Sequence, residues 1–353
     1  MSLQPRARIH TANIVANWRA IASLAPDSEA GAVVKANAYG HGAGPVARAL
    51  RKAGCKTFFV AYVEEGVELR ECIGPDAHIF IFNGVEPADM QLVQDLGLVP
   101  VMNSIPALRE WLSRGGAGKY AVHIDTGMNR LGIRVGDLSE LLDLSHTNPP
   151  HHVMSHLVDS DVPSDPFNSR QRDVFAKLSA AFPEARKSLS NTGGCYLGTG
   201  FEFDITRPGI GLYGGGPTAP EGMEILPGMT LEAPILTVQR ASAGETAGYG
   251  AEWTFNSPRL LATVALGYGD GFPRSAGNTG YANLGGYHCP IVGRVSMDLI
   301  TIDVTSAATL AKPGMFAQFI GAEVALEDQA RLAGTVGYEL VTGLGHRVRR
   351  IYE

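Results

Sequence analysis

Residues 32–42 read AVVKANAYGHG, a short β-branched run followed by small residues and glycine. The apolar run predicts a buried strand, and similar runs alternate with amphipathic segments to about residue 230. About eight strand-like runs occur in this part of the chain: AVVKA (32–36), TFFVAY (57–62), HIFIF (78–82), LVPVM (98–102), YAVHID (120–125), HHVMSHL (151–157), KSLSN (187–191) and a run near 204–207. This alternation predicts an α/β fold, a TIM-like (β/α)8 barrel over residues 9–230. A doubly wound sheet is the alternative.

The pattern changes after about residue 231. Runs such as LTVQRA, RLLATVALGYG and FAQFIGAEV are strand-like and are separated by glycine, with little helix between them. We therefore predict a β-rich C-terminal domain over residues 231–353, to which residues 1–8 could also belong.

Composition excludes several classes of protein. The charged residues give 29 − 35 = −6 and form no basic stripe, so nucleic acid is not an expected partner. No apolar run approaches the ~20 residues that span a bilayer, and the arginines near the start do not fit a secretory signal. The four cysteines are far apart in the sequence, as expected for reduced thiols in a cytoplasmic protein.

Lys35 stands at the end of the first predicted strand, with no acidic residue close in sequence. Desolvation favours the neutral amine, which is the form that makes a Schiff base with a carbonyl. In barrels the chemistry takes place at the carboxyl ends of the strands. Lys35 is thus a candidate nucleophile, although a lysine that pairs with a distant carboxylate would show the same pattern.

The segment RPGIGLYGGG (207–216) has the spacing G-x-G-x-x-G through Gly209, Gly211 and Gly214. It lies late in the chain and does not lead into a predicted helix, which argues against a dinucleotide-binding motif. The amides of successive glycines can hold a phosphate monoester, and in barrels such a site follows the seventh and eighth strands. The location therefore indicates a phosphate site.

Two histidines and two tyrosines also suggest chemistry. His152 and His156 could be a pair of metal ligands, but no H-E-x-x-H motif or cysteine accompanies them, so we expect no metal site. Tyr249 in AGYGAEW and Tyr268 in LGYGDGF are flanked by glycine. A tyrosine acts as a base only if a nearby cation or donor favours loss of its proton, and otherwise serves in packing.

Eight segments, spread in this order over nearly the whole chain, resemble those of alanine racemases: AVVKANAYGHG, HIDTGMNRLGI, MSHLVDSD, SLSNTGG, RPGIGLYGG, GYGAEWTF, LGYGDGFPR and GRVSMDLITID. The resemblance implies an isomerase that uses pyridoxal 5′-phosphate to interconvert L-alanine and D-alanine, supplying D-alanine for peptidoglycan. It also implies a cofactor-binding barrel, a β-rich C-terminal domain, and a cytoplasmic homodimer with active sites at the subunit contacts.

The resemblance also implies roles for individual residues. Lys35 would form the Schiff base, and Tyr249 would reach the cofactor of the partner subunit. The remaining cofactor contacts would come from Tyr39, His156, Asn191, Thr192, Arg207, Gly209 and Ile210. The amino-acid substrate would be bound by Arg130, Tyr268, Met297 and Asp298.

Racemisation needs a base on one face of a planar carbanion and an acid on the other, because one group on one face would return the same enantiomer. By the resemblance, Lys35 would take the α-proton of the D-enantiomer and Tyr249 that of the L-enantiomer. Arg207 would face the pyridine nitrogen. Because a guanidinium does not readily give up a proton, Arg207 would weaken the ring as an electron sink and so discourage transamination.

One position departs from the family pattern. Many members have a lysine, in some of them carbamylated, where this chain has His123, two residues before Asp125. That lysine helps to orient the arginine that corresponds to Arg130. We expect His123 itself, an anion or water to replace it, and no carbamate. His346 stands about where some members have a tyrosine, and we assign it no role.

Other functions stay open at this point. A decarboxylase of the same barrel family would share Lys35 and the phosphate site but should lack Tyr249. A pyridoxal-phosphate carrier would resemble the barrel half alone. A cofactor-free Schiff-base aldolase would not need a phosphate site together with Arg207. A racemase of broader specificity could also accept serine.

Overall fold

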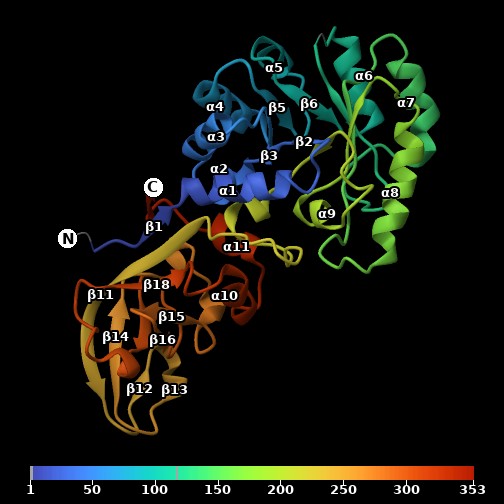
Figure 1. Cartoon of the computed structure of the whole chain (residues 1–353). Helices are drawn as coiled ribbons and strands as arrows, with labels where there is room; N and C mark the ends of the chain where they lie inside the picture. The colour runs from blue at the N-terminus through green and yellow to red at the C-terminus, as the bar shows by residue number, and fades with distance from the viewer. Residues whose placement is uncertain (1–2, 117) are drawn as a thin grey trace.

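The computed structural model describes residues 3–116 and 118–353 (Figure 1). It contains a sheet of parallel strands in the order β3-β4-β5-β6-β7-β8-β9. These strands are short and lie at the predicted positions: β3 (Ala32–Val33), β4 (Thr57–Val60), β5 (His78–Ile81), β6 (Val99–Met102), β7 (Ala121–His123), β8 (His152–Met154) and β9 (Arg186–Ser188). They are rich in buried valine, isoleucine and phenylalanine, as expected for parallel strands covered on both faces.

An eighth strand closes the sheet. β10 (Ile205–Thr206) pairs in parallel with β2 (Glu29–Ala30), which directly precedes β3. On its other side, the Arg207 amide donates to the Ser190 carbonyl at 2.8 Å, just beyond β9. The (β/α)8 prediction is therefore confirmed, and the doubly wound alternative, which leaves two open edges, is wrong.

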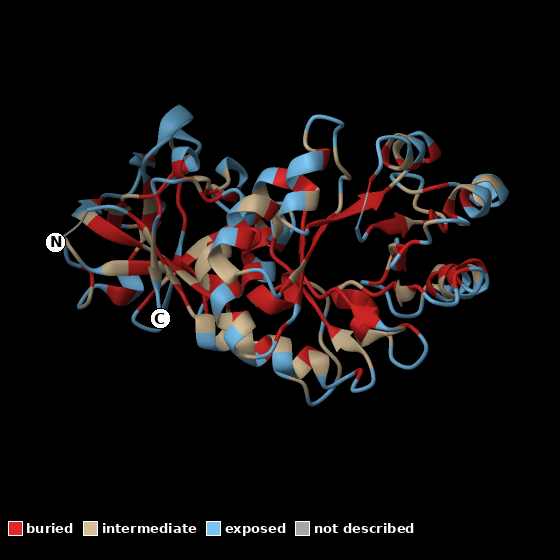
Figure 2. Ribbon diagram, turned by 90° about the horizontal axis from the view of Figure 1, so that it is seen from above, coloured by how far each residue is buried: buried red, intermediate tan, exposed pale blue. Residues whose placement is uncertain are grey.

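Helices surround the barrel: α1 (Thr11–Ala22), α2 (Lys35–Tyr39), α3 (Ala43–Lys52), α4 (Val63–Ile73), α5 (Met90–Asp95), α6 (Ile105–Ser113), α7 (Leu138–Ser145), α8 (Pro166–Ser179) and α9 (Thr192–Tyr196). Their inner faces are buried and their outer faces exposed (Figure 2). Local chemistry fixes several helix starts. The Asp165 carboxylate accepts from the Phe167 amide at 2.7 Å, next to a proline in the first turn of α8.

The second domain is built on a sheet in the order β16-β15-β18-β11-β1-β19, and β14 and β17 extend it from β11. Its strands are β1 (Arg6–Ile9), β11 (Met229–Ala241), β14 (Arg259–Val264), β15 (Tyr281–Leu284), β16 (Tyr287–Pro290), β17 (Ile300–Asp303), β18 (Phe316–Ile320) and β19 (Arg349–Tyr352). A small hairpin of β12 (Thr246–Ala247) and β13 (Trp253–Thr254) and the helices α10 (Leu326–Leu332) and α11 (Gly337–Thr342) complete it.

Strand β1 joins the start of the chain to this sheet. It runs antiparallel to β11 and parallel to β19, so that Arg6 lies between Glu232 and Arg349. Ala7 and Ile9 point into the core, whereas Arg6 points outward and forms an ion pair with Glu232 at 2.6 Å. The proposed domain limits, 9–230 and 231–353, stay a prediction.

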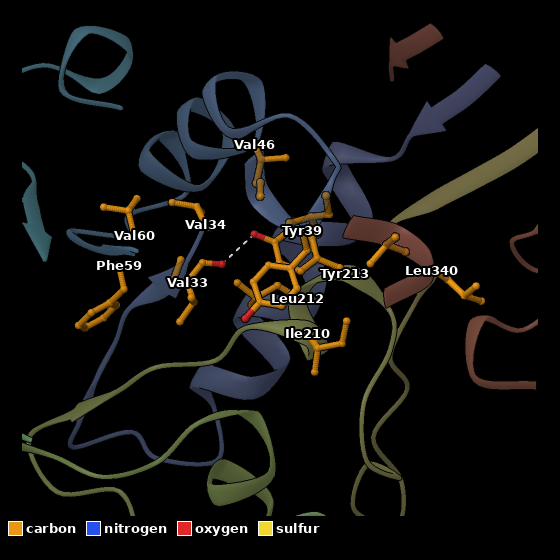
Figure 3. Packing of buried hydrophobic residues seen from close by; sticks show 14 of the residues in the cluster. Val33, Val34, Tyr39, Val46, Phe59, Val60, Ile210, Leu212, Tyr213 and Leu340 are labelled. Atoms are coloured by element: carbon orange, nitrogen blue, oxygen red, sulfur yellow. Dashed lines mark hydrogen bonds between the residues drawn. The ribbon is translucent and has the colours of Figure 1, made fainter. Parts of the chain in front are cut away.

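The two domains meet where α11 packs against α2. Gly40 has a φ of +78°, and a Cβ there would lie 2.0 Å from the Val341 carbonyl oxygen. Figure 3 shows the neighbouring core, in which the Tyr213 hydroxyl donates to the Val33 carbonyl at 2.9 Å beside the ring of Tyr39. This close contact places the C-terminal domain beside the carboxyl ends of the barrel strands.

In the described ranges, no helix has the length and apolar character needed to cross a membrane.

Candidate active site

A cavity of about 630 Å³ lies at the carboxyl ends of the barrel strands. Residues that follow β3, β7, β8, β9 and β10 line it, as do Tyr338 and Thr342 of α11. The structure brings together in its wall nine residues that the sequence singled out: Lys35, Tyr39, Arg130, His156, Asn191, Thr192, Arg207, Gly209 and Ile210.

Lys35 opens a left-handed turn. The sequence predicted that it ends a strand, but β3 stops at Val33 and the chain then turns. Four consecutive residues have φ values of 51°, 54°, 54° and 51°: Ala36, Asn37, Ala38 and Tyr39. Such a run is unusual because the left-handed region costs about 1–2 kcal/mol for each L-residue. Backbone strain of this kind is often found at functional sites.

The amine of Lys35 is largely removed from water. Burial lowers its pKa from the ordinary value, the nearby Arg130 lowers it further, and Glu65 acts in the opposite direction. The Lys35 Nζ lies 5.8 Å from the centre of the Phe82 ring. These surroundings shift the equilibrium of Lys35 toward the neutral, nucleophilic amine.

The glycine-rich segment and α9 form one polar corner of the cavity. The Thr192 hydroxyl oxygen accepts from the amides of Gly209 at 2.9 Å and Gly211 at 3.2 Å. Its own proton is therefore available to a ligand. A Cβ at position 209 would lie 2.6 Å from the Tyr39 hydroxyl, so only glycine lets the tyrosine come this close. Asn191 caps α9, accepting from the Gly194 amide at 2.9 Å.

Arg207 is 3% exposed and is held by three hydrogen bonds. Its Nη1 donates to the Ser188 hydroxyl, and its Nη2 donates to the carbonyls of Ser155 at 2.6 Å and Leu189 at 3.0 Å. Burial lowers the pKa of Arg207 to about 10, so it stays charged at neutral pH. The Nε makes no hydrogen bond within the described chain and is free to meet a ligand in the cavity.

His123 is fixed in one neutral form. The side-chain amide of Asn103 donates to the carbonyls of Phe82 at 2.8 Å and Val101 at 3.1 Å, so its oxygen faces His123 Nδ1 at 3.0 Å. Because that oxygen can only accept, Nδ1 carries the proton and Nε2 is left as an acceptor. Burial lowers the pKa of His123 to about 4, with Arg207 adding to the effect. The ring is thus uncharged at neutral pH.

The cavity is cationic. Two arginines, Arg130 and Arg207, line it together with the basic Lys35, and no carboxylate is among the described lining residues. Arg130 makes no hydrogen bond or ion pair with any residue in 3–116 or 118–353. Burial, together with these arginines, also lowers the pKa of His156 well below its usual range. Positive charge that no lining carboxylate balances suits a ligand that carries phosphate and carboxylate groups.

The other four predicted residues lie elsewhere. Tyr249, Tyr268, Met297 and Asp298 belong to the C-terminal domain and do not line the cavity of their own chain. Tyr249 is 73% exposed, on a turn beside the ion pair of Arg294 and Glu252. The last three are brought together, because the Tyr268 and Gly269 amides donate to the carbonyls of Ser296 and Met297 at 3.1 and 2.8 Å.

The sequence did not point to Tyr338. This tyrosine of α11 lines the cavity, with its ring centre 6.1 Å from that of Tyr39. His346, which stands in the sequence about where some family members have a tyrosine, is exposed and does not line the cavity. Asn103 and Glu65 were missed as well. Their partners are distant in sequence, so no local spacing could have revealed them.

No group of three or more histidine, cysteine or acidic residues in the described chain is arranged to hold a metal ion.

Family comparison adds an independent finding. The family model described as "Alanine racemase, N-terminal domain" matches residues 9–217, and "Alanine racemase, C-terminal domain" matches residues 228–352. The chain belongs to the alanine racemase family. Alanine racemases are isomerases, and the match to the C-terminal domain argues against the carrier alternative, which would resemble the barrel half alone.

Individual alanine racemases are similar over their whole length. One from Methylobacterium nodulans is 42% identical over 354 residues, covering 98% of this chain and 95% of the relative. A catabolic alanine racemase of Agrobacterium fabrum is 40% identical, covering 95% of this chain and 89% of that one. These racemase names favour an isomerase over the decarboxylase and aldolase alternatives.

Solved alanine racemases share the fold. The Bartonella henselae alanine racemase with covalently bound pyridoxal phosphate has a TM-score of 0.94 and 34% identity, and the alignment covers 100% of both chains. The biosynthetic alanine racemase of Pseudomonas aeruginosa has a TM-score of 0.93 and 30% identity, again over 100% of both chains.

Proposed function

We propose that this chain is an alanine racemase that holds pyridoxal 5′-phosphate through Lys35 and transfers protons with Lys35 and Tyr249 of the partner subunit. The observation that carries the proposal is the cavity itself. A desolvated lysine stands there with two arginines and no carboxylate, at the carboxyl ends of the barrel strands. Covalently bound pyridoxal phosphate in the Bartonella henselae relative supports this choice of cofactor.

The residues present fit this cofactor. The free proton of Thr192, the Tyr39 hydroxyl and the backbone at Gly209 and Ile210 would hold the phosphate, with Asn191 fixing the start of α9. The Arg207 Nε would face the pyridine nitrogen as a donor, since its other nitrogens are already bonded to the protein. When bound, the cofactor delocalises the electron pair left at Cα after the α-proton is removed.

Proton transfer then needs one group on each face. The Lys35 amine, freed when the substrate amine takes its place on the cofactor, would take the α-proton of D-alanine, and the partner subunit's Tyr249 would give a proton to the opposite face, which yields L-alanine. In the reverse direction the tyrosine is the base and the protonated lysine the acid. His156, held neutral beside Arg207, supports a hydrogen-bond chain toward the tyrosine.

The substrate carboxylate is bound by Arg130. The His123 Nε2, left as an acceptor by Asn103, would receive a hydrogen bond from this guanidinium and orient it. A neutral imidazole thus does here what a carbamylated lysine does in other members. Tyr268, Met297 and Asp298 of the partner subunit would border the carboxylate and the entrance.

The proposed shared sites require a homodimer, since Tyr249 does not line the cavity of its own chain and is exposed. We further propose a cytoplasmic location, a small amino acid as the only substrate partner, and a role in supplying D-alanine for peptidoglycan. Restored growth of a D-alanine auxotroph that expresses the chain would support this role. Failure to restore growth despite racemase activity in extracts would contradict it.

Incubation with L-alanine in deuterated buffer tests the activity. We expect deuterium at Cα together with D-alanine, and a slower reaction with L-serine because the added hydroxyl must be desolvated. Exchange without the D-enantiomer, or no exchange, would contradict the proposal. Equal rates with alanine and serine would show a racemase of broader substrate specificity.

A further inference from the structure

The carboxylate of Glu65 joins two strand ends. Glu65 lies in the first turn of α4, and its Oε1 accepts from the Ala36 amide at 2.6 Å. Its Oε2 accepts from the amides of Ala61 at 2.7 Å and Tyr62 at 3.3 Å. Ala36 is the residue next to Lys35, whereas Ala61 and Tyr62 follow β4. One side chain therefore ties the start of the lysine turn to the neighbouring strand of the barrel.

The turn depends on such external contacts. Its four residues with positive φ are not glycines, so the backbone would relax toward ordinary dihedral angles without them. Inside the turn, the Ala38 amide donates to the Val34 carbonyl at 2.8 Å. The Asn37 side chain, accepting from the Ala43 amide at 2.8 Å, holds the far end. Glu65 is the acceptor that holds the end nearest the lysine.

Glu65 is also the acidic side chain that acts on the Lys35 amine. The Arg130 guanidinium faces that amine from the segment after β7, and His156, which lines the cavity after β8, is influenced by Lys35 in turn. The other titratable residues of the same cavity are His123, Arg207, Tyr39, Tyr62 and Tyr338. Against these cations and neutral groups, the Glu65 charge raises the pKa of Lys35, opposing burial and Arg130.

We propose that Glu65 is a positioning residue for Lys35, because its two oxygens hold the left-handed turn against the end of β4. This inference rests on the proposed function, in which Lys35 binds the cofactor and moves a proton. Glutamate is required for two reasons. Both of its oxygens accept, whereas glutamine has one acceptor and would turn its amide toward an N–H group. Aspartate keeps the charge but is too short to reach both sides.

The test follows formation of the lysine-bound cofactor. The full-length chain, freed of cofactor, is mixed with pyridoxal 5′-phosphate and no amino acid, and the rate of appearance of the visible band is measured against pH. For Glu65→Gln we expect the rate at high pH to fall about tenfold, because the amine is misplaced. We also expect the half-maximal rate at lower pH, because loss of the negative charge lowers the pKa of Lys35 further.

Two variants separate positioning from folding. Glu65→Asp should lose rate at high pH but keep the wild-type midpoint, since the charge remains. Glu64→Gln removes an exposed charge from the same helix turn, without a hydrogen bond to the lysine turn, and should match wild type. A Glu65→Gln variant with wild-type plateau and midpoint would overturn the proposal, even if its melting temperature fell.

The same experiment distinguishes failure of the proposed function from failure of the Glu65 proposal. If wild type forms no lysine-bound cofactor, both proposals are overturned. If wild type forms it and Glu65→Gln does so with the same rate and the same pH dependence, only the role of Glu65 is overturned.

Discussion

The cavity wall and the Tyr249 turn present their functional residues in opposite ways. Arg207 is 3% exposed and bonded to three neighbours, and Tyr39 is 7% exposed and stacked on Tyr213. Tyr249 is 73% exposed and Met297 is 53% exposed. The predicted cofactor contacts thus line a cavity of one chain, whereas the four predicted residues of the C-terminal domain lie outside it, although α11 of that domain lends Tyr338 and Thr342 to the cavity. The difference teaches that the cavity and the exposed Tyr249 turn can be altered independently of each other.

The largest expected effect comes from changing Lys35, which lines the cavity. Lys35→Ala should remove the visible absorbance of the lysine-bound cofactor and lower racemisation by at least about 10⁴-fold, because the nucleophile and one base are lost together. Absorbance spectra and a D-alanine assay measure both effects. An unchanged visible band in this variant would contradict the assignment of Lys35.

A change in the Tyr249 turn should separate cofactor binding from catalysis. Tyr249→Phe should keep the visible band, because the wall is untouched, but lower racemisation by about 10²–10⁴-fold. Loss of the band would mean that Tyr249 is needed for cofactor binding.

Mixed dimers sharpen this second prediction. Co-expression of Lys35→Ala and Tyr249→Phe should restore roughly a quarter of wild-type activity, since about half of the dimers are mixed and each has one intact site. Each variant expressed alone is the control. No restoration in isolated mixed dimers would show that Tyr249 does not act across the subunits.

A smaller effect is expected for Asn103, which does not line the cavity but contacts the lining residue His123. Asn103→Ala frees the His123 ring to change its protonated nitrogen, so Arg130 loses its oriented acceptor. We expect KM for alanine to rise about tenfold, comparable to the loss of one hydrogen bond to a charged group, with a lesser change in kcat. A normal KM would contradict the role of His123 as an acceptor.

The contact between the two domains at Gly40 and Val341 can be tested by its effect on stability. Gly40→Ala places a Cβ 2.0 Å from the Val341 carbonyl oxygen at a φ of +78°, so the domains must separate locally. We expect a loss of about 2–4 kcal/mol in the free energy of unfolding. Gly54→Ala is the matched control, because its φ is +109° but nothing lies within 4 Å of the added atom, and it should lose only about 1 kcal/mol. Equal losses in denaturant titrations would show that the contact does not matter.

The sequence predicted the barrel well because buried parallel strands and amphipathic helices alternate strongly. It also predicted which residues line the cavity, through the family segments. It placed Lys35 in a strand, because a left-handed turn built from KANAY has no glycine to mark it. That turn is stabilised by Glu65, whose position in sequence carries no local signal.

Contacts that form only in three dimensions were out of reach. Asn103 follows β6 and His123 ends β7, so their hydrogen bond depends on the pairing of these strands. Tyr338 enters the cavity because α11 packs on α2, a contact between the end and the beginning of the chain. Residue type and spacing do not predict such packing.

Strand β1 has a consequence for synthesis on the ribosome. It lies between β11 and β19, so its hydrogen bonds to β19 wait until residues 349–352 have left the exit tunnel. The barrel can collapse while translation continues, and β1 can pair with β11 once residues 229–232 have emerged, but its other edge waits for β19. Until then one edge of this segment of alternating arginine and apolar residues lacks its partner strand, and chaperones that recognise extended chains would find it there.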